Sequence, residues 1–161
     1  MSKRQEMQRL IRQYKDETGK TEIEMHEVAR WAASKGWPLP IPANPLDVLA
    51  KEFANAAREQ VDYNPTTGNP YRRYHALKVN QGGTQLHLFI DIEDATRRQM
   101  HASLVNRREQ MVSDGLQLTF DQEHWNSLHQ SEEPIQLPMD LAFDIELRKN
   151  APKPEDEAEA A

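Results

Sequence analysis

Residues 71–92 read YRRYHALKVNQGGTQLHLFIDI, in which two alternating runs of apolar and polar residues flank a pair of glycines. The runs, Tyr71–Val79 and Thr84–Ile92, contain β-branched and aromatic residues with the alternation that is typical of strands. The intervening NQGG suits a tight turn, because glycine adopts the left-handed backbone that such turns require. We therefore predict an antiparallel β-hairpin in which Val79 lies opposite Thr84.

In that register Arg72 faces Asp91, which is a favourable cross-strand pair. One face of the hairpin is then expected to join the core, and the other to be partly exposed. The expected core face comprises Tyr71, Arg73, His75, Leu77, Val79, Leu86, Leu88, Ile90 and Ile92. The more exposed face comprises Arg72, Tyr74, Ala76, Lys78, Gln85, His87, Phe89 and Asp91.

Two amphipathic helices are predicted in the first part of the chain. Ser2 and Gln5 form a capping box for a helix that runs to about Glu17. The T-x-x-E box at residues 21–24 begins a second helix, and Gly36 lies where a C-terminal capping glycine belongs.

The next stretch, WPLPIPANP at residues 37–45, contains too many prolines to be helical. Its apolar residues favour an extended strap across the domain's own core over a proline-rich ligand for another protein. Asn44 as the N-cap and Pro45 as the first helical residue then begin a third helix. This helix ends near Val61, and residues 62–70 are predicted to form a loop.

After the hairpin, a fourth helix is predicted from a cap at Asp91 or Glu93 to about Ser113, where Asp114 and Gly115 should end it.

The C-terminal part of the chain is predicted to be irregular. Residues 116–120 alternate like a short strand, Asp121 caps a brief helix, and residues 134–147 alternate again in places. Residues 151–161 are acidic and contain prolines, so we expect a disordered tail.

The order of three helices and a hairpin in residues 2–92 resembles a winged-helix domain, with NQGG at the tip of the wing. We therefore predict a single α+β domain of residues 1–150. Residues 2–92 form its winged-helix-like half, and residues 93–150 add a long fourth helix and a short β-containing C-terminal extension. The connection between the second and third helices is longer than the turn of a helix-turn-helix motif, so the resemblance is one of architecture.

Composition excludes several classes of protein. The chain has no cysteine, which removes disulfides, thiolate metal sites and cysteine nucleophiles. No apolar run is long enough to span a membrane, and the charged start leads into no signal peptide. We therefore expect a soluble, cytoplasmic protein that makes no membrane contact.

The net charge of −6 belongs to the C-terminal part of the chain, where acids outnumber bases from residue 131 onward. The rest is neutral, with its bases concentrated on the first helix, the hairpin and the fourth helix. Because phosphate contacts supply most of the affinity for DNA, this distribution argues against indiscriminate DNA binding. The same distribution is compatible with a local contact between these bases and an anion.

The fourth helix carries an unusual combination of groups. Arg97, His101 and Arg108 project from the middle of an apolar wedge, which comprises Met100, Leu104, Val105, Met111 and Val112. An unpaired buried charge is very costly. These cations must therefore pair with the chain's own acids, such as Asp62, Asp91, Asp140 or Asp144, or meet an external phosphate or acidic surface.

Residues 66–75, TTGNPYRRYH, are the best single candidate for a contact surface, because arginine and tyrosine are enriched at binding hot spots. With the basic positions of the fourth helix they define the candidate binding residues: Tyr71, Arg72, Arg73, His75, Arg97, Arg98, His101, Arg107 and Arg108.

Enzymatic signatures are weak. Asp91 and Glu93 share one face of a strand, as the carboxylates of divalent-metal nucleotidyl-transfer sites do, but both also suit helix caps. Pro138 to Arg148 matches a nuclease pattern only loosely. We predict no catalytic residue, no metal site and no cofactor.

The sequence thus predicts a small non-enzymatic binding module, a regulatory or accessory protein that contacts nucleic acid or an acidic partner through the hairpin and the fourth helix. One alternative is a winged-helix-like protein–protein interaction or homodimerisation module without nucleic-acid contact, with the stripe around Met100, Leu104 and Met111 in the dimer surface. Another is a metal-dependent nucleic-acid enzyme centred on Asp91 and Glu93.

Overall fold

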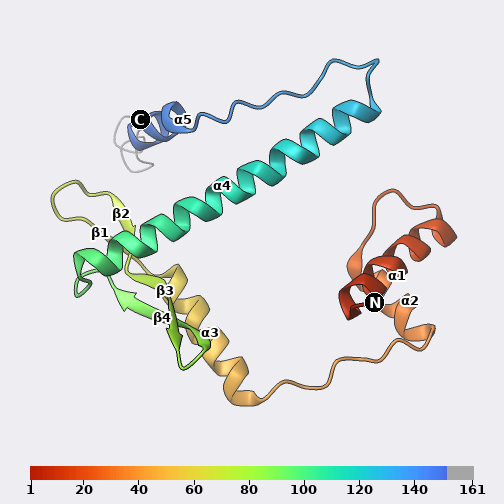
Figure 1. The fold of residues 1–161 in the computed structure, drawn as a ribbon, viewed down its shortest axis with the longest axis horizontal. Helices are drawn as coiled ribbons and strands as arrows, with labels where there is room; N and C mark the ends of the chain where they lie inside the picture. Colours follow the sequence, from red (N-terminus) through yellow and green to blue (C-terminus); the bar gives the residue numbers. More distant parts are fainter. Residues whose placement is uncertain (152–161) are drawn as a thin grey trace, which may run out of the picture. The chain divides into compact units, whose positions relative to one another are not determined.

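The computed structural model describes residues 1–151, which form five helices and two small antiparallel sheets (Figure 1). The α+β class is therefore confirmed. The elements are α1 (Lys3–Thr18), α2 (Met25–Ser34), α3 (Pro45–Glu59), β1 (Val61–Tyr63), β2 (Pro70–Arg72), β3 (Tyr74–Gln81), β4 (Thr84–Asp91), α4 (Arg97–Leu128) and α5 (Ala142–Lys149). None of the helices in this part of the chain combines the length and the apolar character of a membrane span.

The chain divides into two compact units, residues 1–53 and residue 54 onward. The physical reason is the proline-rich stretch at residues 37–44, which is extended and exposes Leu39 and Ile41 almost completely. Pro38, Leu39 and Pro40 still line a hollow with residues of α1 and α2, as the predicted strap would, whereas Ile41 is 91% exposed and does not. The predicted acidic tail lies outside the described residues from residue 152 onward.

Unit 1 is a pair of helices whose ends are set by their caps. Ser2 and Gln5 form the predicted capping box of α1. The cap of α2 is Glu24 and not Thr21, because the Glu24 carboxylate accepts hydrogen bonds from the backbone N–H groups of His26 and Glu27. Gly36 has a φ of +94°, as expected of a glycine that follows a helix end.

The core of unit 1 is small and is completed by polar contacts. Tyr14, Val28 and Ala32 are its buried residues. The Tyr14 ring meets Trp31 edge-on, with 5.7 Å between ring centroids. The Tyr14 hydroxyl donates to the Glu27 carboxylate at 2.8 Å, so the core residue also joins the two helices by a hydrogen bond.

The third helix begins as predicted, with the Asn44 side chain accepting a hydrogen bond from the Leu46 N–H and Pro45 as the first helical residue. The loop predicted for residues 62–70 is instead a small hairpin, in which β1 pairs with β2. The Asn64 side chain accepts hydrogen bonds from two backbone N–H groups and forms its turn. The predicted strand from Tyr71 is consequently divided, with Arg73 between β2 and β3.

In the β3–β4 hairpin Gln81 lies opposite Thr84, so the predicted register is wrong by two residues. The reason is that Gly82 and Gly83 alone form the loop, with φ of +59° and +79°, which is the backbone of a two-residue hairpin turn. Tyr74, and not Arg72, therefore lies opposite Asp91. A shift of two keeps every residue on its predicted face.

The fourth helix is longer than predicted. It begins at a capping box formed by Thr96 and Gln99, not at Asp91 or Glu93, and continues through Gly115 to Leu128. A glycine inside a helix costs only about 1 kcal/mol relative to alanine, so the surrounding helix formers override it. The predicted stop at Gly115, the strand at residues 116–120 and the separate short helix are therefore wrong.

Residues 134–139, which we call the C-terminal strap, return along α4 (Figure 1). The Asn126 amide exchanges two hydrogen bonds with the Ile135 backbone, and the Gln122 side chain accepts one from the Leu137 N–H. Gly115 leaves room for the strap, since a Cβ there would lie 2.9 Å from the end of the Met139 side chain. No strand occurs in residues 92–151. The β-containing extension is therefore wrong, because these backbone groups bond to α4 and not to another strand.

The cap of α4 allows a direct test. Thr96→Ala removes the side chain that accepts the Gln99 N–H and should lower the free energy of unfolding by about 1 kcal/mol. Chemical denaturation followed by circular dichroism measures this loss. The control is Ser113→Ala, whose hydroxyl bonds only to the Glu109 carbonyl one turn earlier. An equal loss in both variants would show that Thr96 has no capping role.

Candidate functional site

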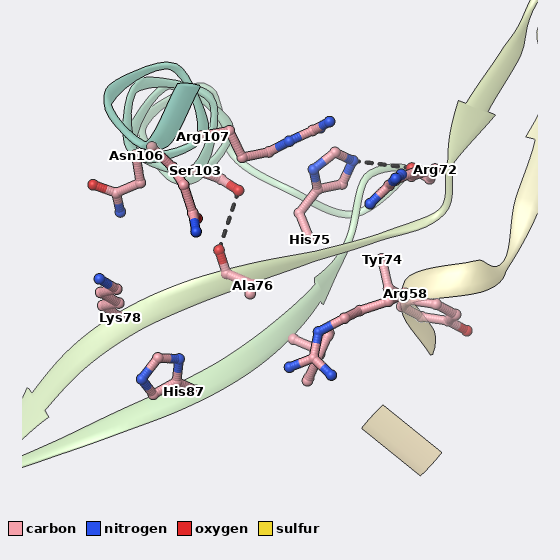
Figure 2. Close-up of a pocket in the computed structure, with 12 residues that line it drawn as sticks. Arg58, Arg72, Tyr74, His75, Ala76, Lys78, His87, Ser103, Asn106 and Arg107 are labelled. Carbon is pink, nitrogen blue, oxygen red and sulfur yellow. Dashed lines mark hydrogen bonds between the residues drawn. The ribbon is translucent and has the colours of Figure 1, made fainter. Parts of the chain in front are cut away.

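The fourth helix packs against the free edge of β3 through a polar contact. The Ser103 side chain is 1% exposed and donates a hydrogen bond of 3.1 Å to the Ala76 carbonyl. An unpaired strand edge exposes carbonyl and N–H groups, and α4 covers this one. The contact places the side chains of α4 beside those of the hairpin (Figure 2).

Beside this contact lies a hollow of about 360 Å³, which we call the basic hollow. Its volume falls within the roughly 300–1,000 Å³ of small-molecule sites. Arginine, lysine and histidine supply its charged groups, and no acidic residue lines it. The lining residues are Arg58, Arg72, Tyr74, His75, Ala76, Lys78, His87, Phe89, Ser103, Asn106, Arg107 and Gln110.

Several elements bring cations to the basic hollow. In Figure 2, Arg107 projects from α4 above the ribbon of β3, whereas His87 and Arg58 lie below it. Arg58 comes from the end of α3, and its guanidinium lies over the Phe89 ring at 5.2 Å from the centroid. This cation–π contact holds Arg58 over the face of the hairpin.

His75 is the buried titratable group of the basic hollow, with 6% exposure. Its Nε2 lies 2.9 Å from the Arg72 carbonyl oxygen. Because a carbonyl oxygen only accepts, Nε2 carries the proton in this contact. His75 therefore fixes the backbone at Arg72, whose own side chain lines the hollow.

Arg73 and Tyr71, two of the predicted binding residues, are engaged by the chain's own acids. The Arg73 guanidinium pairs with Asp91 at 2.7 Å and with Asp62 at 3.3 Å. The Tyr71 hydroxyl donates to Glu93 at 2.7 Å, and this hydrogen bond raises the pKa of Tyr71. Both side chains thus connect the strands to the segment that leads into α4.

The carboxylates of the metal-enzyme hypothesis lie in the same network. The pKa of Asp91 is lowered because its carboxylate accepts the Glu93 N–H, and the Arg73 guanidinium lowers it further. Both bonds go to Oδ1 of Asp91, and Oε1 of Glu93 accepts from Tyr71, so one oxygen of each carboxylate is already engaged within the chain. Within residues 1–151 no three His, Cys, Asp or Glu side chains form a group that could hold a metal ion.

The basic residues of α4 differ in their exposure and in what they contact. Arg107 lines the basic hollow, whereas Arg97, Arg98 and His101 are exposed and form no ion pair within residues 1–151. Arg108 makes only an exposed contact of 3.6 Å with Glu109. The internal pairing considered for this helix therefore does not occur in the described part of the chain.

The apolar wedge predicted around these cations is also largely exposed, since the face that meets β3 is the polar one with Ser103, Asn106 and Gln110. Sequence reasoning also missed Arg58, Lys78 and His87 as residues of the basic hollow. Lys78 and His87 could have been found, because they share the more exposed hairpin face with Arg72. Arg58 could not, since only the folded chain brings it over Phe89.

Comparison of the chain with protein families, with curated proteins and with solved structures finds no match.

The Arg73–Asp91 pair predicts how stability depends on pH. Because the pKa of Asp91 is lowered from its ordinary value near 3.8, its carboxylate stabilises the fold at higher pH. This contribution is lost as the pH falls through the lowered pKa. Asp91→Asn should therefore lower the melting temperature at pH 7, and the two proteins should converge in strong acid.

The matched control is Asp94→Asn, which removes the same charge from a side chain that makes no hydrogen bond or ion pair within residues 1–151. Melting curves from pH 2.5 to 7 measure all three proteins. A difference for Asp91→Asn that persists unchanged in acid would show that the ion pair is not its cause.

Proposed function

We propose that this protein is a small non-enzymatic module that binds nucleic acid through the basic hollow and the adjacent basic face of α4. The observation that carries the proposal is the convergence of Arg58, Arg72, Lys78 and Arg107 around one hollow that no acid lines. Positive charges gathered in one place repel each other and raise the free energy of the folded chain unless an anion binds between them. Phosphate is the anion that nucleic acids present at every nucleotide.

The residue types in the basic hollow also suit a nucleic acid. Arginine binds phosphate oxygens with two N–H groups, and lysine adds a point charge. Tyr74 lies in the same lining and offers a ring on which a base can stack. Arg97 carries positive charge on the exposed side of α4, which would extend the contact along a phosphate backbone.

The predicted resemblance to a winged-helix domain is part of this proposal. Three helices precede the β3–β4 hairpin in the order of a winged-helix protein. The additional β1–β2 hairpin and the extended residues 37–44 depart from that pattern. A basic hollow between hairpin and α4 supports binding through this unit and not through α3 as a recognition helix.

The metal-enzyme alternative is not favoured, because Asp91 and Glu93 already bond to Arg73 and Tyr71. An acidic protein partner would meet the same cations. It is distinguished by the test below, because it would leave the protein without affinity for nucleic acid.

The proposal is tested by titrating the full chain into fluorescent single-stranded and duplex 20-mers at ~50 mM salt. The triple variant Arg72→Gln, Lys78→Gln, Arg107→Gln should bind at least tenfold more weakly. The slope of log K against the logarithm of the salt concentration should become less steep by about two to three units, as the loss of three phosphate contacts requires.

The matched control makes the same three charge changes on α1, where Arg9→Gln, Arg12→Gln and Lys15→Gln are exposed. This variant should bind like the wild type. No binding by the wild type at ~50 mM salt would overturn the proposal, and so would an equal loss in both triple variants.

A further inference from the structure

Within unit 2, one face of α4 is covered neither by the hairpin nor by the C-terminal strap. At 3.6 residues per turn, Ser103, Asn106 and Gln110 lie on the face toward β3, whereas Gly115, Gln122 and Asn126 lie on the face covered by the C-terminal strap. A third face lies between these two. It carries an apolar row that we call the α4 stripe: Val105, Val112, Leu116 and Phe120.

The α4 stripe is exposed, with 42% for Val105, 51% for Val112, 55% for Leu116 and 54% for Phe120. From Val105 to Phe120 the stripe runs for about 22 Å along a helix of 32 residues. An exposed apolar row of this kind is typical of a surface that contacts a partner. The length and the spacing suit a second helix lying along it.

Charged residues beyond the two ends of the α4 stripe indicate the charge pattern that a second helix must carry. Arg98 continues the stripe toward the N-terminus of α4, and Glu123 continues it toward the C-terminus, by the same rotation of 100° per residue. Both are exposed, and neither forms an ion pair within residues 1–151. A helix that is basic at one end and acidic at the other is complementary to an antiparallel copy of itself.

We propose that two copies of this chain associate through their α4 stripes in antiparallel orientation about a two-fold axis near residues 110 and 111. Val105 of one copy then lies against Leu116 of the other. Arg98 lies against Glu123, and the two-fold axis repeats both contacts. Antiparallel packing also opposes the helix dipoles. Glu109 interrupts the stripe near its centre, and the same register places it against Val112 of the other copy, while its carboxylate lies 3.6 Å from Arg108 of its own helix.

The test is the mass of the full chain by sedimentation equilibrium between ~1 and 200 µM, which should rise from one chain to two. Arg98→Glu and Glu123→Arg should each raise the dissociation constant about tenfold or more, since each places like charges together at both ends. The double variant should return it to near the wild-type value.

Leu116→Glu should also weaken the dimer, whereas Leu128→Glu, an exposed leucine on another face of α4, should not. Circular dichroism checks that each variant keeps its helices. A chain that stays monomeric over the whole range overturns the proposal, as does a double variant that remains as weak as the single ones.

Orientation is tested separately, because the chain has no cysteine of its own. Arg98→Cys mixed with Glu123→Cys should form a disulfide-linked pair. Arg98→Cys alone should not, because its two copies would be ~37 Å apart along the helix. If two copies of Arg98→Cys cross-link more readily than Arg98→Cys with Glu123→Cys, the pair is parallel and the antiparallel arrangement is overturned.

Discussion

The Ser103 hydroxyl and the Ala76 carbonyl form the contact on which the arrangement of unit 2 depends. Ser103 is the most completely buried side chain in the described residues, and its hydrogen bond holds α4 against the edge of β3. Because a small polar residue makes this contact, the helix lies close to the strand without a thick apolar layer between them. Side chains on either side of the contact, such as Lys78 and Arg107, therefore line one hollow.

Local signals predicted α1 and α3 well, whereas both ends of α4 were predicted poorly. Ser2, Asn44 and the Gly82–Gly83 turn each act through bonds or backbone angles within a few residues, so the sequence shows them directly. Gly115 looked like a helix end for the same reason. The helix formers on both sides of Gly115 carry the helix through it, and the glycine leaves space for the end of the Met139 side chain, which returns from 24 residues later.

The candidate site was predictable to the extent that it follows strand alternation. Arg72, His75 and Arg107 were among the predicted binding residues and line the basic hollow, whereas Arg73 and Tyr71 turn to Asp91 and Glu93. Sequence composition cannot distinguish residues that line the basic hollow from residues that pair with an acid of the same chain. Whether an arginine meets an acid of its own chain depends on which residues the β1–β2 hairpin brings beside it, and that hairpin was not foreseen.

The small amount of apolar surface that each unit buries has a thermal consequence. The heat capacity change of unfolding comes mainly from apolar surface that becomes hydrated. In unit 1 only Tyr14, Val28 and Ala32 are buried apolar side chains, and hydrogen bonds and caps supplement this small core. Its stability should therefore vary unusually little with temperature, giving a shallow curve with a broad melting transition and weak cold sensitivity.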